Sequence, residues 1–404
     1  MRRVPFQYPC RIRHGSLQPH PSYQADLDAG TRVSSYTSRL CINDLPTLKL
    51  SLQKANIAIE APVEGETSHG VVSFVTIGPD RIRGVMKLMA LPKPATAEAS
   101  IVAQIHDSSF LDPYLAGLGS SRVADGTSIG FAHVFGTFLA KTTLRGVADT
   151  PVVVLVTERF DALLDSKIIA CMANDAVQWR RLVGLVLQVM TILAQGQAMF
   201  GLVHNDAHLG NFMVTATDAA STSSTHAYIS TSSDSDDDMV LRLPLRERVT
   251  LIDFGRSSLG TAQGRRIASS EVREKFPKWE KNGMEADVMH FAAMLVLIQP
   301  RAGYLEEHAR KPDAPACAVA LIRLIWSALQ CGAVDMYDSY NTCAEDTKTN
   351  CSHTAIHFLR KKSSHCVGAT PESWLNDAEL TGEFRAPVRW AQPCAPRVLV
   401  AQPH

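Results

Sequence analysis

The sequence predicts an α+β protein of two lobes, the first rich in β-strands and the second larger and mostly helical. Two observations indicate this fold class. Strand-like segments separated by turn residues occupy the region from residue 71 to residue 160, and long apolar segments of helical length follow from residue 182 onward. A chain of 404 residues is long enough to build more than one hydrophobic core.

The β-rich lobe is expected to form from four apolar, mostly β-branched segments, with a turn at Pro79-Asp80 and one helix that begins at a Thr cap. The strands are VVSFVTI (71–77), RIRGVMKLMAL (81–91), IGFAHVFGTFLA (129–140) and PVVVLVTERF (151–160), and the helix is TAEASIVAQIH (96–106).

The second lobe is expected to surround one long apolar helix. Residues 182–203 carry no charge and have the length that a bilayer requires. Gln188, Gln195 and Gln197 interrupt the apolar surface, so we interpret the segment as the buried helix of a large core rather than as a membrane span. Two further buried helices are predicted over 285–298 and 317–329.

The boundaries follow from composition. We expect a poorly ordered basic leader (1–45), an N-terminal lobe (46–158), a C-terminal lobe (159–385) and a tail (386–404). Residues 215–247 read as an exposed Ser/Thr/Asp-rich insertion with a short hairpin around HAYIS.

Charge and cysteine content exclude some classes of function. Lys plus Arg and Asp plus Glu each number 40, so no net charge draws the chain to nucleic acid or to an anionic membrane. The nine cysteines are odd in number and scattered, which favours a reduced, intracellular compartment.

The stretch GLVHNDAHLGNFMV (201–214) places His204, Asp206, His208 and Asn211 within eight positions, directly after the long apolar segment. A zinc site is one interpretation, but a further ligand and the helical spacing of metalloproteases are missing. Phosphoryl transfer is the other: a carboxylate beside the attacking hydroxyl, with an amide and a second carboxylate that hold Mg²⁺ on the phosphates.

The other groups that this reaction needs occur in order along the chain. Lys87 lies in a predicted strand, Glu98 follows on the next predicted helix, and Asp253 ends the predicted strand RVTLIDFG. Upstream, GETSHGVV (65–72) fits G-x-x-x-x-G-x-V, in which glycines let the backbone approach phosphate closely.

Together these residues resemble the protein kinase superfamily over roughly residues 60–298. Matching positions in the first lobe are Gly65, Gly70 and Val72 in the glycine-rich loop, Lys87 as the β3 lysine, Glu98 as its partner, and Glu158 and Phe160 beside adenine at the hinge. Matching positions in the second lobe are His204, Asp206 and Asn211 in the catalytic loop, the Asp253-Phe254-Gly255 triplet, and Asp287 at the start of the αF helix.

The resemblance implies a two-lobed protein-kinase-like fold and a serine/threonine protein kinase that uses ATP and Mg²⁺. Asp206 would accept the proton of the acceptor hydroxyl, Asn211 and Asp253 would hold Mg²⁺, and Lys87 would bind the α and β phosphates. His204, Phe254, Gly255 and Asp287 would be structural. A protein substrate is expected, with neither nucleic acid nor a membrane as partner.

A narrower resemblance is to protein kinases of giant DNA viruses, on the basis of Tyr228 and of Leu243-Pro244 between the catalytic loop and Asp253. A soluble protein of the host cytoplasm or the virion would follow.

Several positions depart from the family pattern. Thr67 stands at the middle glycine of the loop, which predicts weaker nucleotide binding, and no A-P-E sequence lies between Gly255 and Asp287. His208, at a γ-phosphate-contacting position, replaces a lysine and is typical of small-molecule kinases such as the aminoglycoside and choline kinases. Such an enzyme is one alternative, and a pseudokinase that acts as a binding scaffold is the other.

Asn205 replaces the arginine that ordinarily receives an activation-loop phosphate. We therefore expect activity without activation-loop phosphorylation. Phosphatase-treated protein should retain its rate of phosphoryl transfer, with complete dephosphorylation checked by intact mass. An inactive dephosphorylated protein that regains activity on phosphorylation would contradict this.

Overall fold

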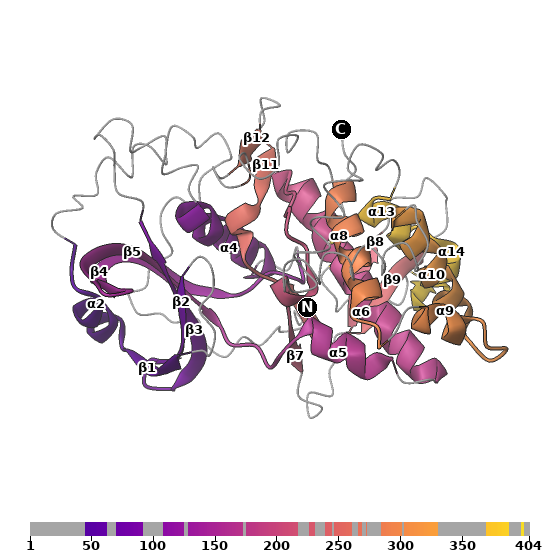
Figure 1. Ribbon diagram of the computed structural model, residues 1–404, viewed down its shortest axis with the longest axis horizontal. Helices are drawn as coiled ribbons and strands as arrows, with labels where there is room; N and C mark the ends of the chain where they lie inside the picture. Colours follow the sequence, from indigo (N-terminus) through magenta and orange to yellow (C-terminus); the bar gives the residue numbers. More distant parts are fainter. Residues whose placement is uncertain are drawn as a thin grey trace, which may run out of the picture.

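The computed structural model describes residues 45–62, 70–91, 108–124, 128–172, 175–216, 226–230, 239–244, 246–260, 266–268, 272, 284–300, 303–329, 369–387 and 397–399. The fold is α+β, with a curled β-sheet in the N-terminal part and a helical later part (Figure 1). This confirms the predicted α+β fold class, with a β-rich part followed by a larger helical part. The expected leader and most of the expected tail lie outside the described residues.

The N-terminal sheet has five strands in the order β1-β2-β3-β5-β4, and each neighbouring pair is antiparallel. The strands are β1 (Ile57–Pro62), β2 (Val71–Ile77), β3 (Ile82–Ala90), β4 (Val134–Leu144) and β5 (Val147–Glu158). The predicted strands at 71–77 and 81–91 are confirmed. The strand predicted over 129–140 instead begins at Val134, because Phe131 leaves the sheet and pairs with Leu251 in the other lobe.

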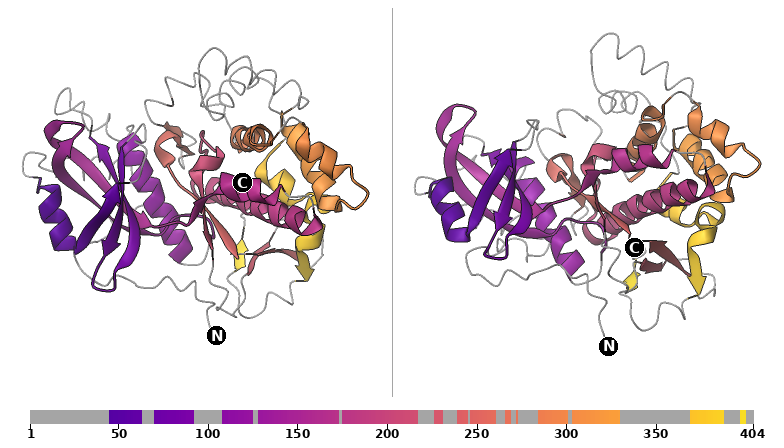
Figure 2. Two further views of the ribbon diagram at one scale, coloured as in Figure 1. Left: turned by 60° about the horizontal axis from the view of Figure 1, so that its bottom comes forward. Right: turned by 90° about the horizontal axis from the view of Figure 1, so that it is seen from below.

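β5 is buried on both faces, which explains its unbroken apolar sequence. Val152, Val154 and Val156 pack with helix α2 (Leu48–Ala55) on one face. Val153 and Leu155 face helix α4 (Ser108–Ala124) and join the core of the second lobe. One face of the sheet therefore packs into the hydrophobic core of the helical lobe, and α4 lies at the junction between the sheet and that lobe (Figure 2).

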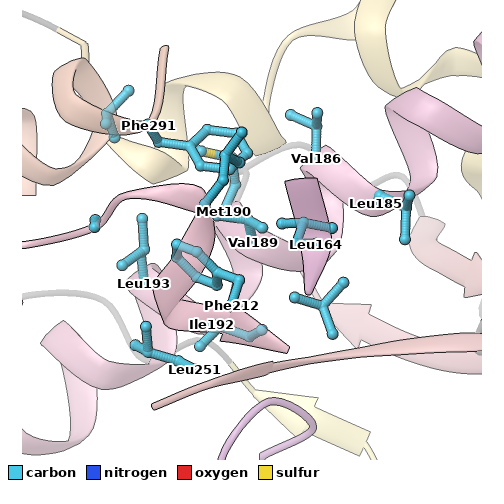
Figure 3. Packing of buried hydrophobic residues seen from close by; sticks show 14 of the residues in the cluster. Leu164, Leu185, Val186, Val189, Met190, Ile192, Leu193, Phe212, Leu251 and Phe291 are labelled. Atoms are coloured by element: carbon cyan, nitrogen blue, oxygen red, sulfur yellow. The ribbon is translucent and has the colours of Figure 1, made fainter. Parts of the chain in front are cut away.

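Helix α6 (Ala176–Phe200) forms the centre of the second lobe. It begins where the Asp175 side chain accepts a hydrogen bond from the Gln178 N–H, and it ends at Gly201, whose left-handed φ of 58° suits glycine. By length and composition α6 could span a membrane, but most of it is buried here, against Leu164, Phe212, Leu251 and Phe291 (Figure 3). The prediction of a buried helix is confirmed.

The glutamines that interrupt α6 serve as anchors for neighbouring strands. The Gln188 amide donates to the carbonyls of Pro244 and Glu247 and accepts from the Val249 N–H. Gln195 accepts from the Ser128 hydroxyl. These buried amides therefore hold two neighbouring segments against α6, residues 244–249 through Gln188 and residue 128 through Gln195.

Further helices pack around α6, and those predicted at 285–298 and 317–329 are confirmed. They are α5 (Leu164–Cys171), α8 (Met284–Leu297), α9 (Tyr304–Ala309), α10 (Ala316–Leu329), α13 (Pro371–Leu375) and α14 (Ala378–Thr381). Next to them lie a sheet of β6 (Ala162–Leu163), β7 (Phe212–Ala216) and β10 (Glu247–Leu251), and a pair of β11 (Ser258–Gly260) and β12 (Arg266–Ala268).

The segment between β7 and β10 contains the predicted hairpin, formed by β8 (His226–Ser230) and β9 (Met239–Pro244). This hairpin joins β13 (Arg385–Pro387) and β14 (Arg397–Leu399) in a four-stranded sheet. Leu241 and Leu243 on β9 are buried. Part of the insertion expected to be exposed therefore belongs to the core.

Gly130 is the tightest point of this packing. A Cβ atom there would lie 1.8 Å from Ile192 Cγ1 of α6, while the Gly130 carbonyl accepts from the Leu251 N–H. We expect Gly130→Ala to lower the free energy of unfolding by about 1–3 kcal/mol in urea titrations. Gly382→Ala is the matched control, because no atom lies within 4 Å of its added Cβ. Equal effects in the two variants would contradict this packing.

Candidate active site

Pairing of β7 with β10 brings Asn211 and Asp253 together. The register places Phe212 opposite Leu251, and the Ile252 N–H donates to the Asn211 carbonyl at 2.9 Å. Asn211 thus precedes one strand where Asp253 follows the other. Two residues 42 positions apart (253 − 211 = 42) therefore lie at the same end of an antiparallel strand pair.

The loop that carries Asp206 is bound through its backbone by the carboxylate of Asp287 on α8. The backbone N–H groups of His204 and Asn205 donate to the two oxygens of this buried carboxylate, at 2.7 and 2.8 Å. Asn205 has a left-handed φ of 60°, a strained conformation that this bonding stabilises. Asp287 therefore holds the backbone of the loop that carries Asp206.

His204 and Phe254 join the loop to the segment around Asp253. His204 Nε2 lies 3.1 Å from the Ile252 carbonyl oxygen, and its ring meets the Phe254 ring at 5.6 Å, edge to face. Phe254 in turn stacks on Phe131 with 6.0 Å between ring centroids. His204 and Phe254 are buried, which agrees with structural roles.

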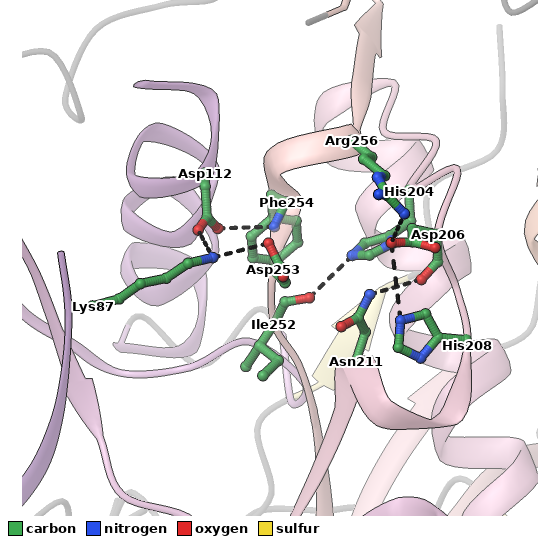
Figure 4. Close-up of polar contacts among 10 residues, drawn as sticks. All are labelled: Lys87, Asp112, His204, Asp206, His208, Asn211, Ile252, Asp253, Phe254 and Arg256. Carbon is green, nitrogen blue, oxygen red and sulfur yellow. Dashed lines mark hydrogen bonds and ion pairs between the residues drawn. The ribbon is translucent and has the colours of Figure 1, made fainter. Parts of the chain in front are cut away.

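Lys87 reaches across from the N-terminal lobe. On β3 it lies opposite Leu155 of β5, and its Nζ is 2.7 Å from Asp112 Oδ2 and 3.0 Å from Asp253 Oδ1 (Figure 4). Asp112 also accepts from the Phe254 N–H through its other oxygen, at 2.8 Å. One ammonium and one carboxylate therefore connect β3, α4 and the segment at 253–255.

The structure shows a partner of Lys87 that was not predicted from the sequence, Asp112 of α4. Glu98, the predicted partner, lies outside the described residues, so its pairing stays a prediction. A signal was present in the sequence, because Asp112 is the single charged residue in the apolar stretch SSFLDPYLAGLGSS. A carboxylate in such a stretch is buried only if it is paired.

The electrostatics of this cluster keep Lys87 protonated. Burial alone would lower the pKa of Lys87, but the charges of Asp112 and Asp253 and their hydrogen bonds outweigh it, so the pKa is raised above its ordinary value. A fixed positive charge therefore lies between the two lobes.

Asp206 is mostly buried and is bonded on several sides. Its Oδ2 accepts from Arg256 Nη1 at 3.0 Å and lies 3.9 Å from His208 Nε2 (Figure 4). Its backbone carbonyl accepts from the Asn211 amide nitrogen at 2.9 Å. Since the amide nitrogen is used in this bond, the Asn211 amide oxygen is directed away from Asp206 and is available as a ligand.

His208 begins the short 3-10 helix Leu209–Asn211, and its Nδ1 accepts from the Gly210 N–H at 3.1 Å. Burial lowers the pKa of His208, although the charge of Asp206 opposes this effect. The ring of His290 from α8 lies 6.0 Å behind it, and burial lowers the pKa of His290 to about 3. Both rings are neutral at pH 7.

The described part of the glycine-rich segment lies beside Lys87. Val72 pairs with Lys87 across β2 and β3. A Cβ atom at Gly70 would lie 2.3 Å from the Leu88 carbonyl oxygen, so only glycine fits there. Gly65 and Thr67 lie outside the described residues.

Glu158 ends β5 and ties this end of the sheet to the second lobe. Its carboxylate accepts from the His133 N–H at 2.8 Å and pairs with Arg248 of β10 at 2.6 Å. Phe160, two residues on, is half-buried. Both residues lie at the junction of the lobes, where the hinge was expected, and the Glu158 side chain acts there as a clamp.

The donor atoms at the site suit a hard cation. Asn211 supplies an amide oxygen and Asp253 a partly exposed carboxylate, and Mg²⁺ prefers such oxygen ligands. Within the described ranges, no three His, Cys, Asp or Glu side chains gather as a metal site. His204 and His208 are directed to Ile252 and Gly210, which does not support a zinc site.

No model of a known protein family matches the sequence, and no curated protein matches it. Among solved structures, the chain is similar to one described as the ROP18 kinase domain in complex with AMP-PNP and sucrose. The two share 14% identity and a TM-score of 0.40, over 86% of this chain and 98% of that chain.

Replacement of Asp112 tests its role as the partner of Lys87. We expect Asp112→Ala to lower the free energy of unfolding by about 1–3 kcal/mol, because Lys87 loses an ion pair and the Phe254 N–H loses its acceptor. Glu98→Ala is the comparison and should change stability less. A larger loss in Glu98→Ala, measured by urea titration, would restore Glu98 as the partner.

His290 should make stability depend on pH. An unfolded histidine takes up a proton near pH 6.5, whereas folded His290 stays neutral down to about pH 3, so acidification favours the unfolded chain. Between pH 6.5 and 5 this amounts to roughly 2 kcal/mol. The loss of unfolding free energy from pH 7 to pH 5 should therefore be smaller by about that amount in His290→Gln. Parallel pH profiles for the two proteins would exclude this role of His290.

Proposed function

We propose that this chain is an ATP-dependent phosphotransferase, specifically a serine/threonine protein kinase that uses Mg²⁺. The observation that supports this best is the cluster of Lys87, Asp112 and Asp253, on the boundary between the lobes and next to Asp206 and Asn211. Phosphoryl transfer depends on placed charges rather than on covalent chemistry by the protein, and these are the charges it requires.

Lys87 is proposed to bind the α and β phosphates. Its ammonium is held in place by two carboxylates and stays protonated, so the side chain is already positioned to bind a polyphosphate. Asp112 acts through Lys87 and the Phe254 N–H as a positioning residue. Val72 lies opposite Lys87 on the same face of the sheet and, because it is only partly buried, offers an apolar surface for the base.

Asn211 and Asp253 are proposed to hold Mg²⁺. A magnesium ion bound there neutralises charge on the phosphate oxygens. The two ligands are kept in register by the β7–β10 pairing, and the Asn211 amide is oriented by its bond to the Asp206 carbonyl.

Asp206 is proposed to orient the acceptor hydroxyl and to take its proton. The acceptor oxygen forms a bond to the γ-phosphorus as the bond from that phosphorus to the β–γ bridging oxygen breaks. ADP leaves with the electrons of that bond, and the hydroxyl proton passes to Asp206. The positions of Asp287 and Asn205 below the loop support this role, because they prevent Asp206 from shifting.

A small-molecule kinase is the second candidate. It is favoured by His208, whose neutral ring stands where protein kinases carry a lysine. A scaffold without activity is disfavoured, because Lys87, Asp206, Asn211 and Asp253 are all present. The narrower likeness to giant-virus kinases and a soluble intracellular location stay predictions from the sequence.

The decisive experiment follows γ-phosphate transfer from ATP with Mg²⁺ to generic Ser/Thr protein acceptors, to the chain itself and to a panel of hydroxylated small molecules. We expect transfer to protein by the wild type and a loss of about 10²–10⁴-fold in kcat in Asp206→Asn.

Asp149→Asn is the matched control, because Asp149 is an exposed carboxylate near the start of β5 with a left-handed φ that asparagine tolerates. It should retain full activity. Equal incorporation by wild type and Asp206→Asn would exclude the role of Asp206. Transfer to small molecules alone would favour the second candidate, and no transfer to any acceptor would exclude a phosphotransferase.

A further inference from the structure

Arg256, the residue after Gly255, lies directly against the proposed base. Its Nη1 is 3.0 Å from Asp206 Oδ2, and both side chains are largely buried, with 22% and 11% of their surface exposed. The two residues come from different segments, so this ion pair closes the gap between the catalytic loop and the 3-10 helix Phe254–Arg256 (Figure 4).

The backbone of Arg256 is fixed by the residue next to Asp206. The Asn205 amide nitrogen donates to the Arg256 carbonyl at 3.1 Å, and also to the Val203 carbonyl and the Ser258 hydroxyl. Residues 205–206 and residue 256 are therefore joined twice, once through the backbone of Arg256 and once through its side chain. The guanidinium is held beside Asp206 rather than meeting it by chance on a flexible arm.

This contact leaves one way to reach Asp206. Its Oδ1 is buried and has no hydrogen-bond partner among the residues that the structure describes. Its Oδ2 is covered by Arg256. An acceptor hydroxyl that approaches Oδ2 must therefore meet the guanidinium, and the acceptor has to share or displace it.

We propose that Arg256 selects acceptors that carry a carboxylate beside the hydroxyl, so that the substrate is an acidic Ser/Thr peptide. This inference rests on the proposed kinase function. A guanidinium presents five donors in a planar fork, and a neighbouring carboxylate can take those that Asp206 releases. A neutral acceptor would displace Asp206 from Arg256 without supplying another carboxylate to the guanidinium. A basic acceptor would in addition be repelled by the positive charge of Arg256.

Among the residues that the structure describes, Lys87 is directed to Asp112 and Asp253. His208 Nε2 lies 3.9 Å from Asp206 Oδ2, farther than Arg256 Nη1 at 3.0 Å. Of these described side chains, Arg256 is therefore the cation in hydrogen-bond contact with the proposed base. Arg256 is a positioning residue for Asp206 and a specificity residue for the acceptor.

The test compares three Ser peptides that are identical except for the flanking residues, which are Asp, Asn or Lys. For the wild type we expect kcat/KM to be at least about tenfold higher for the Asp peptide than for the Asn peptide, the size of one charge-assisted hydrogen bond. In Arg256→Gln this ratio should fall to near one, mainly through KM for the Asp peptide. Arg256→Lys keeps the positive charge but loses the planar set of donors, and it should restore part of the preference for the Asp peptide.

Arg323→Gln is the control, because it removes a cation that pairs with Asp377 and Glu379 on the surface of α10, away from the site. It should keep the preference of the wild type. Binding of a fluorescent ATP analogue by each variant shows whether the site is still folded. Transfer with no Asp preference in the wild type, or an unchanged preference in a folded Arg256→Gln, would overturn the inference and leave the kinase function standing. Absence of transfer to all three peptides by a wild type that phosphorylates generic protein acceptors would overturn the inference alone, and absence of transfer to those acceptors as well would overturn both.

Discussion

The candidate site depends on one buried ion-pair junction. Lys87 of β3, Asp112 of α4 and Asp253 after β10 come from both lobes, and Asp112 binds the Phe254 backbone as well. Each charge is stable in its low-exposure position because the other charges are present. The junction therefore joins the sheet, through β3 and α4, to the segment that follows β10, so that the parts of the candidate site from the two lobes are held together.

A second set of contacts supports the loop that carries Asp206. Asp287 accepts from two successive N–H groups, and Asn205 bonds to three segments of chain, so short polar contacts add to the packing of the buried Ala207 and Leu209. On the other side, Glu158 and Arg248 clamp the end of β5 to β10. Strain in the loop backbone is tolerated because it is surrounded by these bonds.

Much of this could be predicted from the sequence, because its determinants are local. Alternating apolar residues define β2 and β3, the uncharged run of α6 defines the centre of the second lobe, and the order of Asp206, Asn211 and Asp253 indicates their chemistry. Asp112 as a partner of Lys87 could not be predicted, because the packing of α4 against residues 253–254 is what brings its carboxylate to Lys87. The start of β4 and the buried face of β9 likewise depend on contacts from distant segments.

The four-stranded sheet pairs strands that lie far apart in the sequence and are therefore synthesised at different times. Leu241 on β9 pairs with Arg385 on β13, a separation of 385 − 241 = 144 positions, and β8 pairs in parallel with β14, which comes later still. During synthesis the β8–β9 hairpin emerges long before the strands that cover its two edges. Until those strands are made, the N–H and C=O groups on the two outer edges of the hairpin have no strand partner, and unpaired strand edges promote association between chains. The second lobe is thus a late-closing structure with high contact order, and a chain released before residue 385 would retain an open sheet edge.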